Sequence, residues 1–168
     1  MIARGYQREF EEFVRESSDG LLRTSYLLCG DRGHAEDIVQ TALIRVARRW
    51  RSARRDPAAY ARRVVVNLSK DRWRSLSRRP AEAGFEVDVA APESDAVAER
   101  DALVRAVRQL PEGQRAVLVL RYFEDLSVAD TAAALGCTAG TVKSQTARAL
   151  TGLRSLLAPE EEMNNAHR

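Results

Sequence analysis

The segment Leu126–Arg154, LSVADTAAALGCTAGTVKSQTARALTGLR, has the pattern of two short helices joined by a tight turn. Ser127 is a good N-cap for the first helix, with Asp130 three residues later as its partner in a capping box. Gly136 suits the left-handed position that ends such a helix, and Thr138 can cap the helix that follows. The segment therefore predicts a helix-turn-helix, with an ordinary surface helical hairpin as the alternative.

The second of these two helices has two unlike faces. Spacings of four, three and four residues place on one face Val142, Thr146, Ala149 and Leu153. The residues that point the opposite way are Ser144, Ala147, Arg148 and Thr151, with Lys143 and Gln145 on the flanks. A helix that is buried on one side and carries such polar side chains on the other is suited to the major groove of DNA.

Positive charge is concentrated in one part of the chain. The formal net charge of the 168 residues is only +3, but residues 45–79 contain 13 basic and 2 acidic residues. Residues 81–99 contain six acidic residues and no basic ones. Such a segregated basic block indicates a polyanionic partner.

The two cysteines, Cys29 and Cys137, are isolated, which argues against a zinc site or a disulfide framework and favours a reducing compartment. We find no apolar run of membrane length and no signal peptide, so we expect a cytoplasmic protein with no membrane partner.

Helical periodicity recurs along the chain, and no segment alternates convincingly as a strand does, so we expect an all-α fold. The pattern predicts two opening helices, a long helix over Gly33–Trp50, a loop over Arg51–Arg55, and a helix from Pro57, capped by Asp56, to about Arg78. Helical pattern resumes near Val97 and restarts at Leu110-Pro111-Glu112, ahead of the helix-turn-helix. We therefore expect two small helical domains at 1–79 and 97–158, an acidic flexible linker at 80–96, and a disordered tail at 159–168.

Two surfaces stand out on the predicted N-terminal domain. One stripe of the helix after Pro57 carries Arg63, Asn67, Lys70 and Arg74, with Trp73 beside it and the arginines of residues 51–55 upstream. Cations interleaved with aromatic rings suit an unpaired nucleic-acid strand. The alternative is a solvated basic face with both tryptophans in the core; core is the better reading for Trp50, and Trp73 fits either.

The second surface lies on the long helix, where Asp37, Gln40, Thr41, Ile44 and Arg48 face away from the apolar stripe. An isoleucine in a polar outward face suggests that another protein docks there.

We find no nucleophile with a base, no phosphate-binding loop and no metal cluster, so we expect neither an enzyme nor a cofactor. A DNA-processing enzyme such as a recombinase would need such a cluster in the N-terminal half. A stand-alone helix-turn-helix regulator remains the main alternative, although no dimerisation helix is evident.

The chain resembles the extracytoplasmic-function (group IV) sigma factors of bacterial RNA polymerase, in the sigma-70 family. The similarity runs from about Phe10 to Leu157. It is carried by residues 35–40 (AEDIVQ), 63–74 (RVVVNLSKDRWR), 110–115 (LPEGQR) and 140–144 (GTVKS), in this order, with an acidic linker between the second and third.

The resemblance implies three surfaces. The helix of residues 33–50 would dock on the clamp helices of the largest polymerase subunit through Asp37, Gln40, Thr41, Ile44 and Arg48. The non-template strand of the minus-ten element would be melted and held by Arg51, Arg54, Arg55, Arg63, Asn67, Lys70, Trp73 and Arg74. The minus-thirty-five duplex would be read by Thr141, Lys143, Ser144, Gln145 and Arg148.

The resemblance also implies core RNA polymerase, including its flap, and promoter DNA as partners, with an anti-sigma factor as a candidate further partner and a place on the nucleoid. The chain departs from the family at three positions. Thr41 stands where glutamate is common, Thr131 where isoleucine is usual, and Gln145 where arginine is frequent. Because glutamine favours adenine edges and arginine favours guanine, we expect a different promoter preference.

Overall fold

The computed structural model describes residues 4–77 and 95–158, and every regular element in these two ranges is helical. The expected all-α class with two helical groups is confirmed. In chain order the elements are a short 3₁₀ turn η1 (Arg4–Tyr6), α1 (Gln7–Cys29), α2 (Arg32–Arg48), α3 (Trp50–Ala53), α4 (Pro57–Ser77), α5 (Asp95–Gln109), α6 (Glu112–Leu118), the π-helical segment η2 (Val119–Phe123), α7 (Val128–Leu135) and α8 (Ala139–Leu157).

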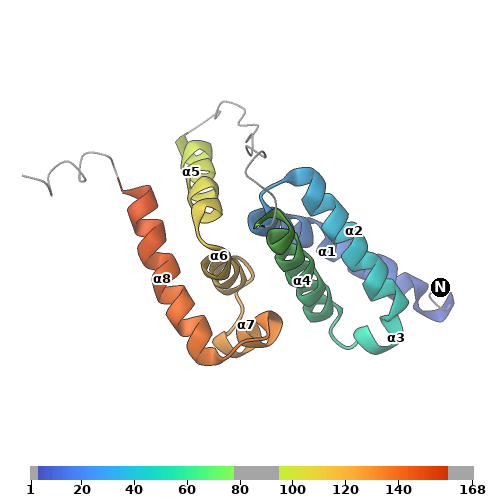
Figure 1. The fold of residues 1–168 in the computed structure, drawn as a ribbon. Coiled ribbons are helices and arrows are strands. Elements are labelled where there is room, and N and C mark those ends of the chain that lie inside the picture. The colour runs from blue at the N-terminus through green and yellow to red at the C-terminus, as the bar shows by residue number, and fades with distance from the viewer. Residues whose placement is uncertain (1–3, 78–94, 159–168) are drawn as a thin grey trace, which may run out of the picture.

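The elements form two groups, α1–α4 and α5–α8, which we call the N-terminal and C-terminal domains (Figure 1). Helix α4 lies at the boundary, where it contacts α6 and α7 of the C-terminal domain. The expected linker and tail fall almost entirely outside the described residues, although α5 already begins at Asp95. The expected domain limits stay predictions.

The core of the N-terminal domain lies where α1, α2 and α4 meet. The apolar stripe predicted for α2 is buried there, with Ala35, Ala42 and Val46 fully inaccessible. Trp50, just beyond α2, packs edge-to-face on Phe10 with 5.2 Å between ring centroids, which confirms its prediction as a core residue. Burying a ring of this size is among the largest single contributions that a small core receives.

The prediction of two opening helices was wrong, because α1 is one continuous helix of 23 residues. The weak helix formers at residues 17–20 do not interrupt it, and the hydroxyl of Ser18 bonds back to the carbonyl of Val14 within the helix. Phe13, Leu21 and Leu28 on either side are all buried in one hydrophobic cluster, so packing outweighs local propensity. The helix ends at Gly30, whose φ of 79° is left-handed.

The predicted loop over residues 51–55 was wrong in part, because Trp50–Ala53 forms the short helix α3. Both Trp50 and Ala53 are buried, and their spacing of three residues fits one helical turn against the core. The predicted cap of the next helix is confirmed, since the Ala59 backbone N–H donates to Asp56 Oδ1 over 3.0 Å.

The helix-turn-helix is confirmed as α7 and α8, with the expected caps at both helix starts. Backbone N–H groups donate to the Ser127 hydroxyl over 3.0 Å and to the Thr138 hydroxyl over 3.1 Å. Between the helices, Gly136 has a φ of 65°, the left-handed conformation that glycine adopts without cost. These three residues place the start of α8 at the surface of the domain.

Candidate nucleic-acid interface

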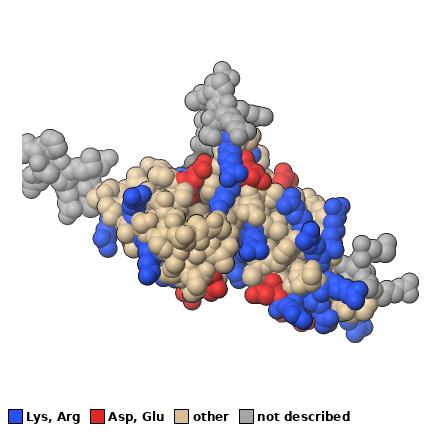
Figure 2. All heavy atoms as spheres, turned by 60° about the horizontal axis from the view of Figure 1, so that its bottom comes forward, with Lys and Arg blue, Asp and Glu red and all other residues tan. Residues whose placement is uncertain are grey.

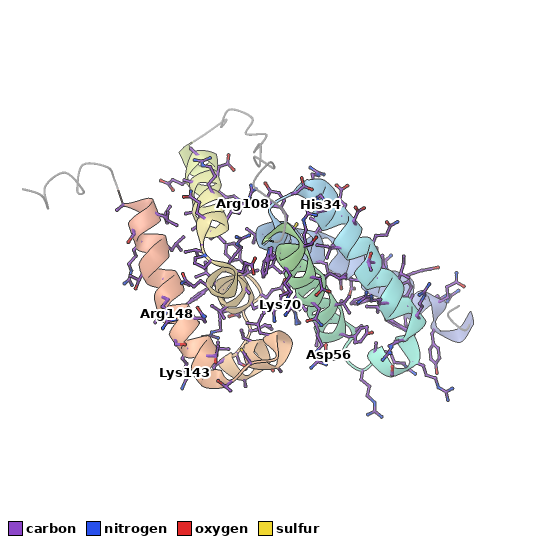
Figure 3. All side chains as sticks on the ribbon, viewed as in Figure 1. His34, Asp56, Lys70, Arg108, Lys143 and Arg148 are labelled. Atoms are coloured by element: carbon purple, nitrogen blue, oxygen red, sulfur yellow. The ribbon has the colours of Figure 1, made fainter. Side chains whose placement is uncertain are left out.

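Helix α8 presents the polar face that its sequence predicts. Val142 and Ala149 are fully buried, while the opposite residues are exposed: Thr141, Lys143, Ser144, Ala147, Arg148 and Thr151. Lys143 and Arg148 project from the outer side of the helix (Figure 3). The helix therefore has a cationic outer face held in orientation by an apolar inner one.

Two of the five residues expected to face duplex DNA have local partners that orient them. The hydroxyls of Thr141 and Thr138 lie 3.0 Å apart, and the Ser144 hydroxyl donates to the Thr141 carbonyl over 3.0 Å. Gln145 is half-buried and lines a cleft that opens toward α4, so it is less exposed than the expectation required.

The stripe predicted on α4 is present, but its members differ in exposure. Arg63, Asn67 and Arg74 are exposed, whereas Lys70 is half-buried and points toward the C-terminal domain (Figure 3). Its Nζ donates to the backbone carbonyl of Leu135 at the end of α7, over 2.7 Å. The stripe therefore lies partly in the boundary between the two domains.

Trp73 is only 6% exposed and belongs to the core in this arrangement. Its indole Nε1 donates to the Leu28 carbonyl over 3.1 Å, and the guanidinium of Arg115 lies over its ring, 5.5 Å from the centroid. The ring is therefore not presented to solvent as a platform on which bases could stack. From the sequence alone, Trp73 fitted both a ring that stacks on unpaired bases and a core residue.

A dense group of arginines covers the end of the N-terminal domain where α2, α3 and the start of α4 meet. We call this the arginine patch, and all its members are exposed: Arg45, Arg48, Arg49, Arg51, Arg54 and Arg55. Figure 2 shows blue side chains gathered over this end of the molecule. Arg54 is held against Glu9 over 3.4 Å and over the Tyr6 ring. The patch and the α4 stripe provide the strong positive potential that a phosphate backbone requires.

The outward face of α2 is as expected from its spacing. Asp37, Gln40 and Arg48 are exposed, Thr41 is half-buried, and Ile44 keeps 48% of its surface accessible. The helix packs on α1 and α4 through its other side. The face thus has polar residues around a single exposed apolar one.

Several polar residues at the domain boundary were not anticipated. Glu124, directly after η2, accepts a hydrogen bond from the Thr24 hydroxyl on α1 and forms an ion pair with Arg62 on α4, with 3.3 Å between Arg62 Nε and Glu124 Oε2. Arg115 on α6 donates to the Leu28 carbonyl over 2.8 Å, and burial lowers the pKa of its guanidinium. Each partner lies many residues away along the chain, so no local pattern marks these contacts.

Within the described ranges no group of three histidine, cysteine or acidic residues could hold a metal ion, and no helix there is long and apolar enough to cross a membrane. Cys29 is buried, which raises the pKa of its thiol.

In a comparison with known proteins, two family models match the chain, one in each domain. The family models named Sigma-70 region 2 and Sigma-70, region 4 match residues 13–79 and 100–153. The RNA polymerase sigma-E factor of Streptomyces coelicolor is 42% identical over 158 residues, which cover 91% of this chain and 88% of that protein. The ECF RNA polymerase sigma factor SigM of Mycobacterium tuberculosis is 34% identical over 155 residues, covering 91% and 79%.

The fold is also similar to a solved structure, the sigma factor RpoE of Bartonella quintana in complex with the anti-sigma factor NepR. The TM-score is 0.74 at 23% identity, and the match covers 89% of this chain and 97% of that one. With the two matched regions in order and relatives more than 30% identical over nine-tenths of its length, the chain belongs to the extracytoplasmic-function sigma factors of the sigma-70 family.

Proposed function

We propose that this protein is a group IV promoter-specificity subunit that binds promoter DNA at two separate places and has no catalytic activity of its own. The observation that carries the proposal is the pair of unlike cationic surfaces, one on α8 and one on α4 with the arginine patch. They lie in different domains, so one chain can contact two DNA elements at once when its domains are held apart.

The C-terminal domain contacts the minus-thirty-five element as duplex. Lys143 and Arg148 neutralise phosphates or reach guanine edges, and Gln145 pairs with adenine edges. The two hydroxyls of Thr141 and Ser144 are fixed by local hydrogen bonds close to the helix start, where phosphate oxygens also meet the backbone N–H groups. Most of the affinity is electrostatic and falls as salt rises.

The N-terminal domain holds the separated non-template strand of the minus-ten element. Arg63, Lys70 and Arg74 on α4 follow the strand backbone with Arg51, Arg54 and Arg55 of the arginine patch, while the Asn67 amide contacts an unpaired base. Because the contact with an unpaired base forms only with the separated strand, its free energy offsets part of the cost of melting. Trp73 supports this surface by anchoring α4 to the end of α1.

Core RNA polymerase supplies catalysis and the spacing between the two domains. The face of α2 around Ile44 docks on the clamp helices of the largest subunit, and the C-terminal domain meets the flap. An anti-sigma factor that covers these surfaces would keep the protein inactive; the structure of the Bartonella sigma factor RpoE is a complex with the anti-sigma factor NepR. We place this protein in the cytoplasm, on the nucleoid when bound to polymerase.

The test is transcription by purified core polymerase on a pooled promoter library, with and without this protein. Initiation only in its presence, at sites that share two spaced elements, supports the proposal. Asn67→Ala should then reduce open-complex formation on a cognate promoter, while Gln109→Ala, an exposed polar residue on α5, should not. Tight binding to duplex DNA without polymerase, and no stimulation of transcription, would instead favour a stand-alone regulator.

A further inference from the structure

The turn η1 and the start of α1 lie beside the arginine patch. They are at the same end of the N-terminal domain as α3 (Figure 1). The family model for region 2 matches from residue 13 onward, so residues 4–12 precede the matched region. The contacts that these residues make with the patch are therefore features of this chain to which the family match assigns no role.

Three aromatic rings fasten the start of α1 to the start of α3. The rings of Phe10 and Phe13 lie 5.2 Å and 5.7 Å from the ring of Trp50, measured between centroids. Trp50 is the first residue of α3, and Arg54 directly follows the last. Aromatic pairs at such distances stabilise a core beyond the area that they bury. The core therefore fixes where Glu9, next to Phe10, lies relative to Arg54.

Two contacts hold the guanidinium of Arg54. Its Nε lies 3.4 Å from Glu9 Oε2, and its Cζ lies over the Tyr6 ring, 4.7 Å from the centroid. The Tyr6 ring is half-buried against the core, so it is a fixed support. The carboxylate meets the Nε side and the ring meets one face, whereas 41% of the arginine side chain stays accessible. The two terminal nitrogens, Nη1 and Nη2, can then bind two oxygens of one phosphate.

Glu9 places a negative charge within a surface that otherwise attracts phosphate. Among the described residues, Arg54 is the one member of the arginine patch with an ion-pair partner. Both side chains of this pair are more than two-fifths accessible, and such an exposed pair contributes little to the stability of a fold. Orientation of the guanidinium is a better explanation of the pair than stability.

We propose that Tyr6 and Glu9 are positioning residues of the strand-binding surface, which hold Arg54 so that Nη1 and Nη2 contact a phosphate of the unpaired strand. A long side chain that is ordered before binding loses less conformational entropy when the ligand arrives. This positioning role rests on the strand-binding role of Arg54 proposed above.

The test measures the lifetime of the open complex formed by holoenzyme with the full-length protein on a cognate promoter, after a DNA competitor is added. Arg54→Ala should shorten the lifetime, because it removes the phosphate contact. An unchanged lifetime would overturn both the strand-binding assignment of Arg54 and the positioning role. A shorter lifetime confirms the assignment of Arg54, so that the variants of Glu9 and Tyr6 then test positioning alone.

Glu9→Gln distinguishes orientation from charge, because the two effects have opposite signs. Loss of a negative charge by itself strengthens the attraction of DNA and lengthens the lifetime. Loss of orientation should instead shorten it by about two- to fivefold, the range that an exposed ion pair supports. The matched control is Glu16→Gln, the same charge change two turns further along the same face of α1, which should not shorten the lifetime. A wild-type or longer lifetime for Glu9→Gln, or equal shortening by Glu16→Gln, would overturn the positioning role.

A double variant shows whether Glu9 acts through Arg54. Glu9 also lies in the first turn of α1, where a carboxylate stabilises the helix start whether or not Arg54 is present. If Glu9 orients Arg54, then Glu9→Gln should cause no further shortening in the Arg54→Ala background. Equal shortening in both backgrounds would show a purely structural role and overturn positioning.

The ring of Tyr6 is tested in the same assay. Tyr6→Leu removes the ring under the guanidinium and should shorten the lifetime, whereas Tyr6→Phe keeps the ring and should recover most of it. Thermal unfolding of each variant by circular dichroism separates a loss of orientation from a loss of folded protein. Equal lifetimes for Tyr6→Leu and Tyr6→Phe, with both proteins folded, would overturn the part of Tyr6.

Discussion

Lys70 on α4 donates a hydrogen bond to the backbone carbonyl of Leu135, 65 residues further along the chain, with 2.7 Å between the two atoms. Leu135 is the last residue of α7, so its carbonyl is one that the helix cannot satisfy internally. The lysine of one domain therefore caps a helix of the other. The same ammonium cannot contact a phosphate while it makes this hydrogen bond.

Thr131→Val should stabilise the protein. Thr131 is fully buried on α7, and its hydroxyl has no hydrogen-bond partner among the described residues. Replacing it with an isosteric methyl removes a buried polar group and should raise the free energy of unfolding by about 1 kcal/mol. Urea denaturation measures the change. Thr146→Val is the control, because the Thr146 hydroxyl donates to the Val142 carbonyl over 2.7 Å and its loss should give no gain. Equal gains from both variants would contradict the prediction.

Two glycines of the first domain should respond to alanine in opposite ways. Gly20 lies inside α1 with nothing within 4 Å of an added Cβ, so Gly20→Ala should stabilise by roughly 0.5–1 kcal/mol. Gly30 has a φ of 79°, and an added Cβ would lie 2.9 Å from the Arg108 guanidinium. Gly30→Ala should therefore destabilise by more than about 1 kcal/mol. Thermal unfolding by circular dichroism distinguishes the two, and shifts of the same sign would contradict this reading.

Gln145→Arg should change promoter preference rather than affinity alone. Glutamine pairs with adenine edges and arginine with guanine edges, and one such pair contributes about 1–3 kcal/mol of discrimination. Selection of minus-thirty-five sequences by holoenzyme should shift one position from adenine toward guanine. Thr151→Arg adds the same charge further along the exposed face of α8 and should tighten binding without changing the selected sequence. An unchanged selection by Gln145→Arg would place Gln145 away from the bases.

Asp31 should make part of the stability depend on pH in the acid range. Asp31 is the N-cap of α2, where its carboxylate accepts a hydrogen bond from the His34 backbone N–H over 2.7 Å. This hydrogen bond is the main reason why the pKa of Asp31 is below its ordinary value. A lowered pKa in the folded state contributes stability that is present above the unfolded pKa and is lost as the pH falls through the folded one.

The measurement is urea unfolding of wild type and Asp31→Asn at about pH 6 and about pH 3. Asparagine also caps helices but does not titrate, so the variant should lose less stability than wild type on acidification. Asp37→Asn, an exposed change on the same helix, should lose as much as wild type. Equal losses for Asp31→Asn and wild type would contradict a role for this cap.

Much of the fold could be predicted from the sequence because its signals are local. Ser127, Gly136 and Thr138 cap or end helices through groups within five residues, and the stripe of α2 follows from helical spacing alone. The continuity of α1 and the short helix α3 could not be predicted, since burial by distant neighbours decides both. The same reason explains why Trp73 fitted two readings and why Glu124 and Arg115 were missed.

The π-helical segment η2 has a consequence for how this chain can diverge. A π segment is equivalent to one residue inserted into an α-helix, and the Glu124 backbone N–H accordingly bonds to the carbonyl of Val119, five residues back, over 3.1 Å. Deleting one residue there would rotate everything after it by about 100° around the helix axis. Because α5 and α6 before this segment pack on α8 after it, such a deletion would break the packing of the C-terminal domain and also turn Glu124 away from Arg62. We therefore expect descendants of this protein to keep the length of η2 unchanged while single residues within it vary, because the loss or gain of one codon there changes the register of every later helix.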